Sequence, residues 1–219
     1  MGTTMRRNDI FTVAASILVA IFFLGGMGFD AYRKHLDAES LISEYRIHST
    51  PEEVIGPYRD FRGEPNSPYT LVEFGDYECP PCHAANEQVA ELMPSLKGKV
   101  RFAFRNFPLT SIHPYAMRAA IEAEAARSLG KFWAAHDGLY SADASSFNAD
   151  TITNVERSLH LPPVALANAE RTTAAAAVHN DMSEARAIRL TGTPSFVLCC
   201  PDGRVVHLSS LSQLGKIVQ

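Results

Sequence analysis

The stretch Leu71-Val72-Glu73-Phe74-Gly75-Asp76-Tyr77-Glu78-Cys79-Pro80-Pro81-Cys82 joins a short apolar run to a Cys-x-x-Cys motif. The run 69–74 predicts a strand, interrupted by one carboxylate at Glu73. Cys79 then opens a predicted helix that extends to about Leu96. Pro80 and Pro81 fall in its first turn, where a missing N–H does little harm.

Two cysteines at a helix start indicate thiol chemistry. The helix N-terminus carries partial positive charge and free N–H groups, which stabilise the thiolate of Cys79 as a nucleophile. Cys82 lies one turn further in and can attack a mixed disulfide formed on Cys79. We therefore interpret the pair as a redox-active disulfide. Half of a zinc site and an inert structural disulfide are the alternatives.

The second cysteine pair, Cys199-Cys200, argues against zinc. Zinc needs four ligands, and adjacent residues on a strand point to opposite faces. We expect no metal site and interpret Cys199 and Cys200 as small buried residues. A vicinal disulfide or a regulatory thiol is the alternative for this pair.

The rest of the chain predicts an α/β order. Strands are expected at 100–107, 195–200 and 205–208, the last two antiparallel, with an alanine-rich helical region about 114–190 and a closing helix at 211–218. The long last helix of the alanine-rich region is expected at about 172–190. His83 is expected to face solvent, and His113 is interpreted as a turn residue before Pro114.

Several motifs in sequence order resemble the DsbA-like thioredoxin-fold oxidoreductases. Besides the quoted stretch they are Arg105-Asn106-Phe107-Pro108-Leu109, His113-Pro114, Gly130-Lys131-Phe132-Trp133 with His136-Asp137, and Gly192-Thr193-Pro194-Ser195-Phe196. The resemblance covers about 63–219. It implies a thioredoxin fold with an α-helical domain inserted between the second and third strands.

The resemblance also implies roles for individual residues. Cys79 is the attacking cysteine and Cys82 the resolving one. Pro194 is expected to be cis beside them, with the backbone of Thr193 pairing with an extended substrate chain. Glu73 matches the acid beneath the active site, a proton shuttle for Cys82. The alternative for Glu73 is an exposed carboxylate on an edge strand.

Pro81 departs from the family pattern, because many members have a backbone N–H there that faces the thiolate. We expect Cys79 to be less acidic than in the strongest oxidants, so the net redox direction stays open. Oxidase activity on protein cysteines is the leading interpretation. A thiol reductase or disulfide isomerase is the second, and a non-enzymatic tethered binding module is the third.

The N-terminal segment predicts export. Residues 10–29 carry no charge, and about 20 apolar residues suffice for one transmembrane helix. Arg6 and Arg7 precede this run, so residues 1–9 are expected in the cytoplasm. A cleaved signal peptide is the alternative. Residues 30–62 are interpreted as a helical stalk over 30–47 followed by a Pro- and Gly-rich linker, and 63–219 as the catalytic domain.

Composition limits the partners. The formal net charge of −4 and a pI near 6.1 argue against nucleic-acid binding, and 46% hydrophobic residues exclude a disordered chain. We expect the catalytic domain outside the bacterial cytoplasmic membrane, acting on exported cysteine-containing proteins. The resemblance implies a membrane redox partner, either a quinone-linked thiol oxidase or a thiol reductant carrier. No cofactor is expected.

Overall fold

The computed structural model describes residues 28–42, 46–57, 60–161 and 168–218. The chain divides into two compact units, residues 1–44 and 45–219. In the first unit, residues 28–42 form a helix. No helix among the described residues has both the length and the apolar character needed to cross a membrane. The expected anchor at 10–29 lies outside the described residues except for Gly28 and Phe29.

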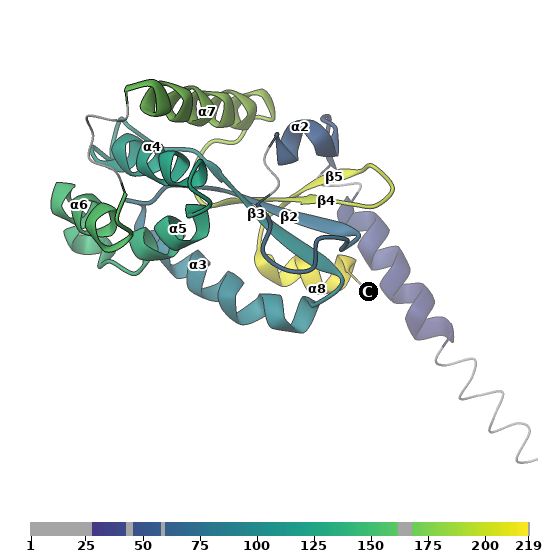
Figure 1. Cartoon of the computed structure of the whole chain (residues 1–219). Helices are drawn as coiled ribbons and strands as arrows, with labels where there is room; N and C mark the ends of the chain where they lie inside the picture. Colours follow the sequence, from purple (N-terminus) through teal and green to yellow (C-terminus); the bar gives the residue numbers. More distant parts are fainter. Residues whose placement is uncertain (1–27, 43–45, 58–59, 162–167, 219) are drawn as a thin grey trace, which may run out of the picture. The chain divides into compact units, whose positions relative to one another are not determined.

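The second unit is built on a five-stranded mixed sheet (Figure 1). Its strands run in the order β1-β5-β4-β2-β3, and only the β2–β3 pair is parallel. The strands are β1 (Arg46–Ile47), β2 (Tyr69–Gly75), β3 (Val100–Asn106), β4 (Ser195–Cys199) and β5 (Val205–Leu208). The predicted strands are confirmed to within about a residue, as is the antiparallel pairing of β4 with β5.

Helices cover both faces of this sheet. Figure 1 shows α3 and α8 on one face and α2, α4 and α7 on the other. The helical segments are α2 (Pro51–Ile55), α3 (Pro80–Leu92), η1 (Met93–Leu96), α4 (Ala116–Arg127), α5 (Phe132–Tyr140), η2 (Ala144–Ser146), α6 (Ala149–Ser158), α7 (Asn168–Ala187), η4 (Leu211–Gln213) and α8 (Leu214–Ile217). The segments from α4 to α7 lie between β3 and β4, as the expected helical insertion requires.

The segment 45–62 differs from the expected stalk and linker, because it belongs to the larger unit. Of the helix expected at 30–47, the structure describes residues up to 42 as helical, whereas Arg46–Ile47 pairs antiparallel with β5. Thr50 and Glu53 form a capping box that starts α2. Val54 of α2 is fully buried against the sheet. Burial of the apolar Val54 side chain explains why this segment folds with the domain.

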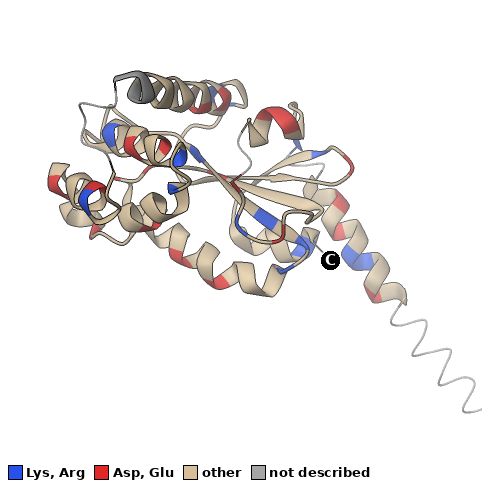
Figure 2. Ribbon diagram, viewed as in Figure 1, with Lys and Arg blue, Asp and Glu red and all other residues tan. Residues whose placement is uncertain are grey.

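Charge distribution agrees with this layering. Figure 2 shows that charged residues gather on helices and loops, while most of the strand ribbon carries none. Glu73 is the only charged residue of β2, and β4 has no charged residue. The carboxyl group of Glu73 in this otherwise apolar strand is energetically costly unless it is paired or protonated.

Candidate active site

Cys79 and Cys82 lie at the start of α3. Cys79 is the N-cap residue, in an extended conformation, and Pro80 and Pro81 follow in the first turn. The N–H of Cys82 donates to the carbonyl oxygen of Cys79 at 2.9 Å. Cys79 is 5% exposed and Cys82 is fully buried. The helix start thus brings the two cysteines together and leaves only Cys79 in contact with solvent.

The two thiols differ in acidity. A hydrogen bond from the Cys82 thiol is the main reason why the pKa of Cys79 falls to about 6. Partial burial and the negative charge of Asp76 oppose that fall, while the backbone N–H of Cys82 supports it. Burial raises the pKa of Cys82 far above its ordinary value. Cys79 is therefore suited to act as a thiolate and Cys82 to hold its proton.

The loop before β4 faces the first sulfur. The Thr193–Pro194 peptide bond is cis, as the family resemblance implies. The Cys79 thiol donates to the carbonyl oxygen of Thr193, with a sulfur–oxygen distance of 3.5 Å. Because β4 pairs directly with β2, the sheet places this loop opposite the start of α3. The predicted neighbours Cys79, Thr193 and Pro194 thus come together.

Glu73 lies inside the sheet, so its interpretation as an exposed edge-strand residue is wrong. Its strand, β2, has β4 on one side and β3 on the other, and Glu73 is fully buried. Neither carboxyl oxygen has a hydrogen-bond partner among the described residues. Burial, followed by the charge of Cys79, raises the pKa of Glu73 to about 8. The side chain is thus a neutral carboxylic acid at pH 7.

Sequence reasoning missed the surroundings of Tyr77. The side chain of His83 is half-buried rather than solvent-facing, with Nε2 2.7 Å from the Tyr77 carbonyl oxygen. The Tyr77 hydroxyl lies 3.3 Å from Nδ1 of the fully buried His136. His136 Nε2 lies 3.2 Å from Asn86 Oδ1 of α3. Burial lowers the pKa of His136, so this ring is neutral and joins α5 to the helix that carries the cysteines.

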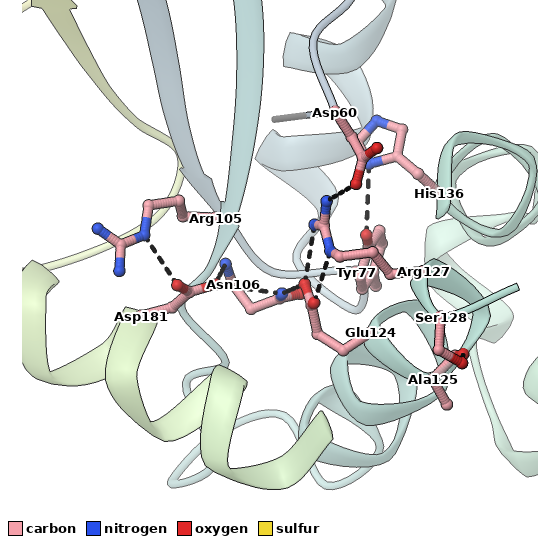
Figure 3. A network of polar contacts seen from close by, with 10 residues as sticks. All are labelled: Asp60, Tyr77, Arg105, Asn106, Glu124, Ala125, Arg127, Ser128, His136 and Asp181. Carbon is pink, nitrogen blue, oxygen red and sulfur yellow. Dashed lines mark hydrogen bonds and ion pairs between the residues drawn. The ribbon is translucent and has the colours of Figure 1, made fainter. Parts of the chain in front are cut away.

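A second polar network ties the helical insertion to the sheet (Figure 3). Arg105 of β3 donates to Asp181 of α7 at 2.8 Å, and both side chains are buried. Asn106 donates to Glu124 of α4 at 2.8 Å, and Glu124 pairs with Arg127. These contacts position α4 and α7 against the edge strand β3.

Cys199 and Cys200 lie apart from this constellation. Both are buried, and Cys199 packs in the apolar cluster between the sheet and α7. Burial raises the pKa of Cys199 to about 12, so it remains a thiol. Their burial fits the interpretation of both as small apolar residues.

Comparison with known proteins decides the family. The model of the thioredoxin family matches residues 57–219. The chain belongs to the thioredoxin family. A thioredoxin-like oxidoreductase from Silicibacter pomeroyi DSS-3 is 28% identical, with a TM-score of 0.64 over 78% of this chain and 96% of that one. The thiol-disulfide exchange protein alpha-DsbA2 from Wolbachia pipientis is 22% identical, with a TM-score of 0.64 over 85% and 96%. These neighbours share the thioredoxin-like fold that the resemblance implies.

The curated relatives of this thioredoxin-family chain are longer proteins. Na(+)/H(+) antiporter NhaA 1 from Salinispora arenicola is 38% identical over 155 residues, which are 70% of this chain and 23% of the relative. Antiporter NhaA 1 from Mycolicibacterium gilvum is 42% identical over 80 residues, 36% of this chain and 13% of the relative. The chain thus spans about a quarter or less of these relatives.

Proposed function

We propose that this protein is a thiol-disulfide oxidoreductase that exchanges disulfides with cysteines of substrate proteins through Cys79 and Cys82. The observation that carries the proposal is geometric: Cys79 is the N-cap of α3 beside the cis Thr193–Pro194 peptide, and Cys82 is fully buried one turn further in. The acidities of the two thiols agree with it. Cys79 has a pKa of about 6, whereas that of Cys82 is raised. An inert structural disulfide needs no such difference.

In the oxidase direction, a substrate thiolate attacks Sγ of Cys79 in the Cys79–Cys82 disulfide. The new bond joins the substrate sulfur to Cys79, and the bonding electron pair leaves with Cys82. Glu73, which is protonated at pH 7, supplies the proton that Cys82 takes up. A second substrate thiolate then attacks the substrate sulfur of the mixed disulfide, and Cys79 leaves as a thiolate. The substrate loses two electrons and the cysteine pair gains them.

Thr193 and Pro194 border the place where the substrate sulfur must arrive. Since the Thr193 carbonyl oxygen already contacts Cys79 Sγ, the backbone beside it is suited to pair with an extended substrate segment. We assign these two residues to substrate binding.

The setting proposed for this reaction is extracytoplasmic. The uncharged run 10–29 would anchor the chain in the bacterial cytoplasmic membrane, with the catalytic domain outside. Exported cysteine-containing proteins are the proposed substrates. A quinone-linked thiol oxidase would restore the disulfide, or a thiol reductant carrier would keep the pair reduced.

Trapping of mixed disulfides tests the proposal. Cys82→Ala leaves Cys79 without its resolving thiol, so substrate adducts should accumulate and disappear on reduction. Cys79→Ala is the matched control, because it keeps a single cysteine in the motif at the buried position. Adducts on non-reducing gels in Cys82→Ala alone are the expected result. Equal patterns in both variants would contradict the exchange mechanism.

A further inference from the structure

Asp76 is a buried carboxylate that touches both cysteines through its backbone. It is 1% exposed, and its carbonyl oxygen accepts from the Cys79 N–H at 3.1 Å. Its own N–H faces the Cys82 sulfur and moderates the rise in the pKa of Cys82 that burial causes. The backbone at this position thus contacts both cysteines of the redox pair.

The carboxylate of Asp76 binds a segment that lies more than thirty residues further along the chain. Oδ2 accepts from the Leu109 N–H at 2.8 Å and lies 2.7 Å from Nδ1 of His113. Oδ1 accepts from the Glu78 N–H at 2.8 Å. Glu78 in turn accepts from the Tyr115 N–H at 2.6 Å. Two carboxylates of the active-site loop therefore hold segment 109–115, the entry to the helical insertion.

The charge of Asp76 opposes the Cys79 thiolate. Two like charges in a partly buried site disfavour each other, and the charge of Asp76 raises the pKa of Cys79. His113 is the side chain that contacts the Asp76 carboxylate and can carry a positive charge, forming an ion pair when its ring is protonated. The side chain of His113 is 15% exposed, so solvent screens this pair weakly.

Other titratable groups surround the same carboxylate. Glu78 anchors the segment, and Tyr140 of α5 has a pKa that burial raises, with the charge of Asp76 adding to the effect. Neither group offers a cation to Asp76. Among the described residues, His113 is the side chain in ion-pair contact with the Asp76 carboxylate, beside the two backbone N–H donors.

We propose that His113 is a positioning residue for thiol exchange: paired with Asp76, it holds the active-site loop and offsets the negative charge beside Cys79. The role in thiol exchange rests on the proposed function. The effect of His113 on the pKa of Cys79, transmitted through Asp76, does not depend on it.

The pH profile of Cys79 alkylation in the reduced protein measures this coupling. His113→Ala removes the imidazole that faces the Asp76 charge and leaves it only the Leu109 and Glu78 N–H donors, so the profile should move to higher pH by about half to one unit. Asp76→Asn removes the opposing charge and should move the profile to lower pH by a similar amount. In the double variant, His113→Ala should add no upward shift, because no carboxylate remains to be compensated.

Two further variants separate the effect of the His113 charge on Cys79 from the effect of loosening segment 109–115. Glu78→Gln loosens the same segment without touching the Asp76–His113 pair, and its shift should be clearly smaller than that of Asp76→Asn. His113→Asn keeps a hydrogen-bond donor but no charge, so it should preserve the fold and still move the profile upward. An unchanged profile in both His113 variants would overturn the proposal, as would an equal upward shift with and without Asp76. Failure to exchange disulfides with glutathione would refute the proposed function and leave this coupling measurable.

Discussion

Glu73 lies on β2 with its carboxyl group fully buried, and burial raises its pKa from an ordinary 4.5 to about 8. The unfolded chain releases this proton near pH 4.5, whereas the native protein keeps it until about pH 8. Between these values the unfolded state binds fewer protons, so the free energy of unfolding falls as pH rises, by about 1.4 kcal/mol per unit.

Replacing Glu73 by Gln removes that pH dependence. As the pH rises from 5 to 7, the free energy of unfolding of Glu73→Gln should increase relative to that of the wild type, by about 3 kcal/mol at most. Denaturant unfolding of both reduced proteins at the two pH values measures the difference. The same variant should slow disulfide exchange, because Cys82 loses its proton source. A stability difference that is equal at both pH values would show that Glu73 is already ionised at pH 5.

Pro81 limits the acidity of Cys79. The backbone N–H of Cys82 supports the thiolate, and proline offers no N–H one residue earlier. Pro81→His adds a backbone donor and an imidazole, so the pKa of Cys79 should fall by about one unit and the disulfide should become more oxidising. Thiolate absorbance titration measures the change. Pro81→Ala, which restores the N–H alone, should give a smaller fall, and a raised pKa in Pro81→His would contradict this explanation.

Gly75 ends β2 where the strand meets the helical insertion. A Cβ at this position would lie 2.4 Å from Phe104 Cε2 and 3.0 Å from the Tyr140 hydroxyl. Gly75→Ala should therefore destabilise the domain by about 1–3 kcal/mol through overpacking. Gly215→Ala is the matched control, because an added Cβ there meets no atom within 4 Å and α8 favours alanine. Equal unfolding midpoints for the two variants would show that Phe104 and Tyr140 move aside at the end of β2 without loss of stability.

The elements that local sequence patterns mark were predicted correctly. β2, α3 and β3 follow from an apolar run, a Cys-x-x-Cys motif and alternation, and the structure agrees with them. The two-residue β1 is too short to show a period, and α2 lies in a Pro- and Gly-rich stretch that resembles a linker. The Thr50-x-x-Glu53 pattern of a capping box is a local signal for the start of α2 that the linker interpretation overlooked.

The residues of the candidate site likewise fall into two groups: those placed by a local motif and those placed by contacts between distant parts of the chain. The placement of Cys79 and Cys82 follows from the motif itself, since the helix start orders them. The burial of Glu73 depends on β4, which pairs with β2 from more than a hundred residues away. The contact between Asp76 and His113 likewise joins residues 37 positions apart, and no local sequence pattern predicts it.

The molecule as a whole is proposed to work outside the cytoplasm. If residues 10–29 are an anchor, the full-length protein should fractionate with membranes. Protease added to intact spheroplasts should then digest the chain after Asp30. A shortened product that begins near Gly28 would indicate a cleaved signal instead. Complete protection of the domain would place it on the cytoplasmic side.

The central claim is that Cys79 and Cys82 form a reversible redox couple. Equilibration of the purified protein with glutathione buffers, followed by alkylation and mass measurement, tests it most directly. We predict a single two-electron transition between about −120 and about −270 mV, the range spanned by DsbA and thioredoxin. The transition should vanish in Cys79→Ala, and Cys199 and Cys200 should stay reduced throughout. Two thiols that remain reduced across the whole range, or a transition that survives Cys79→Ala, would contradict the account.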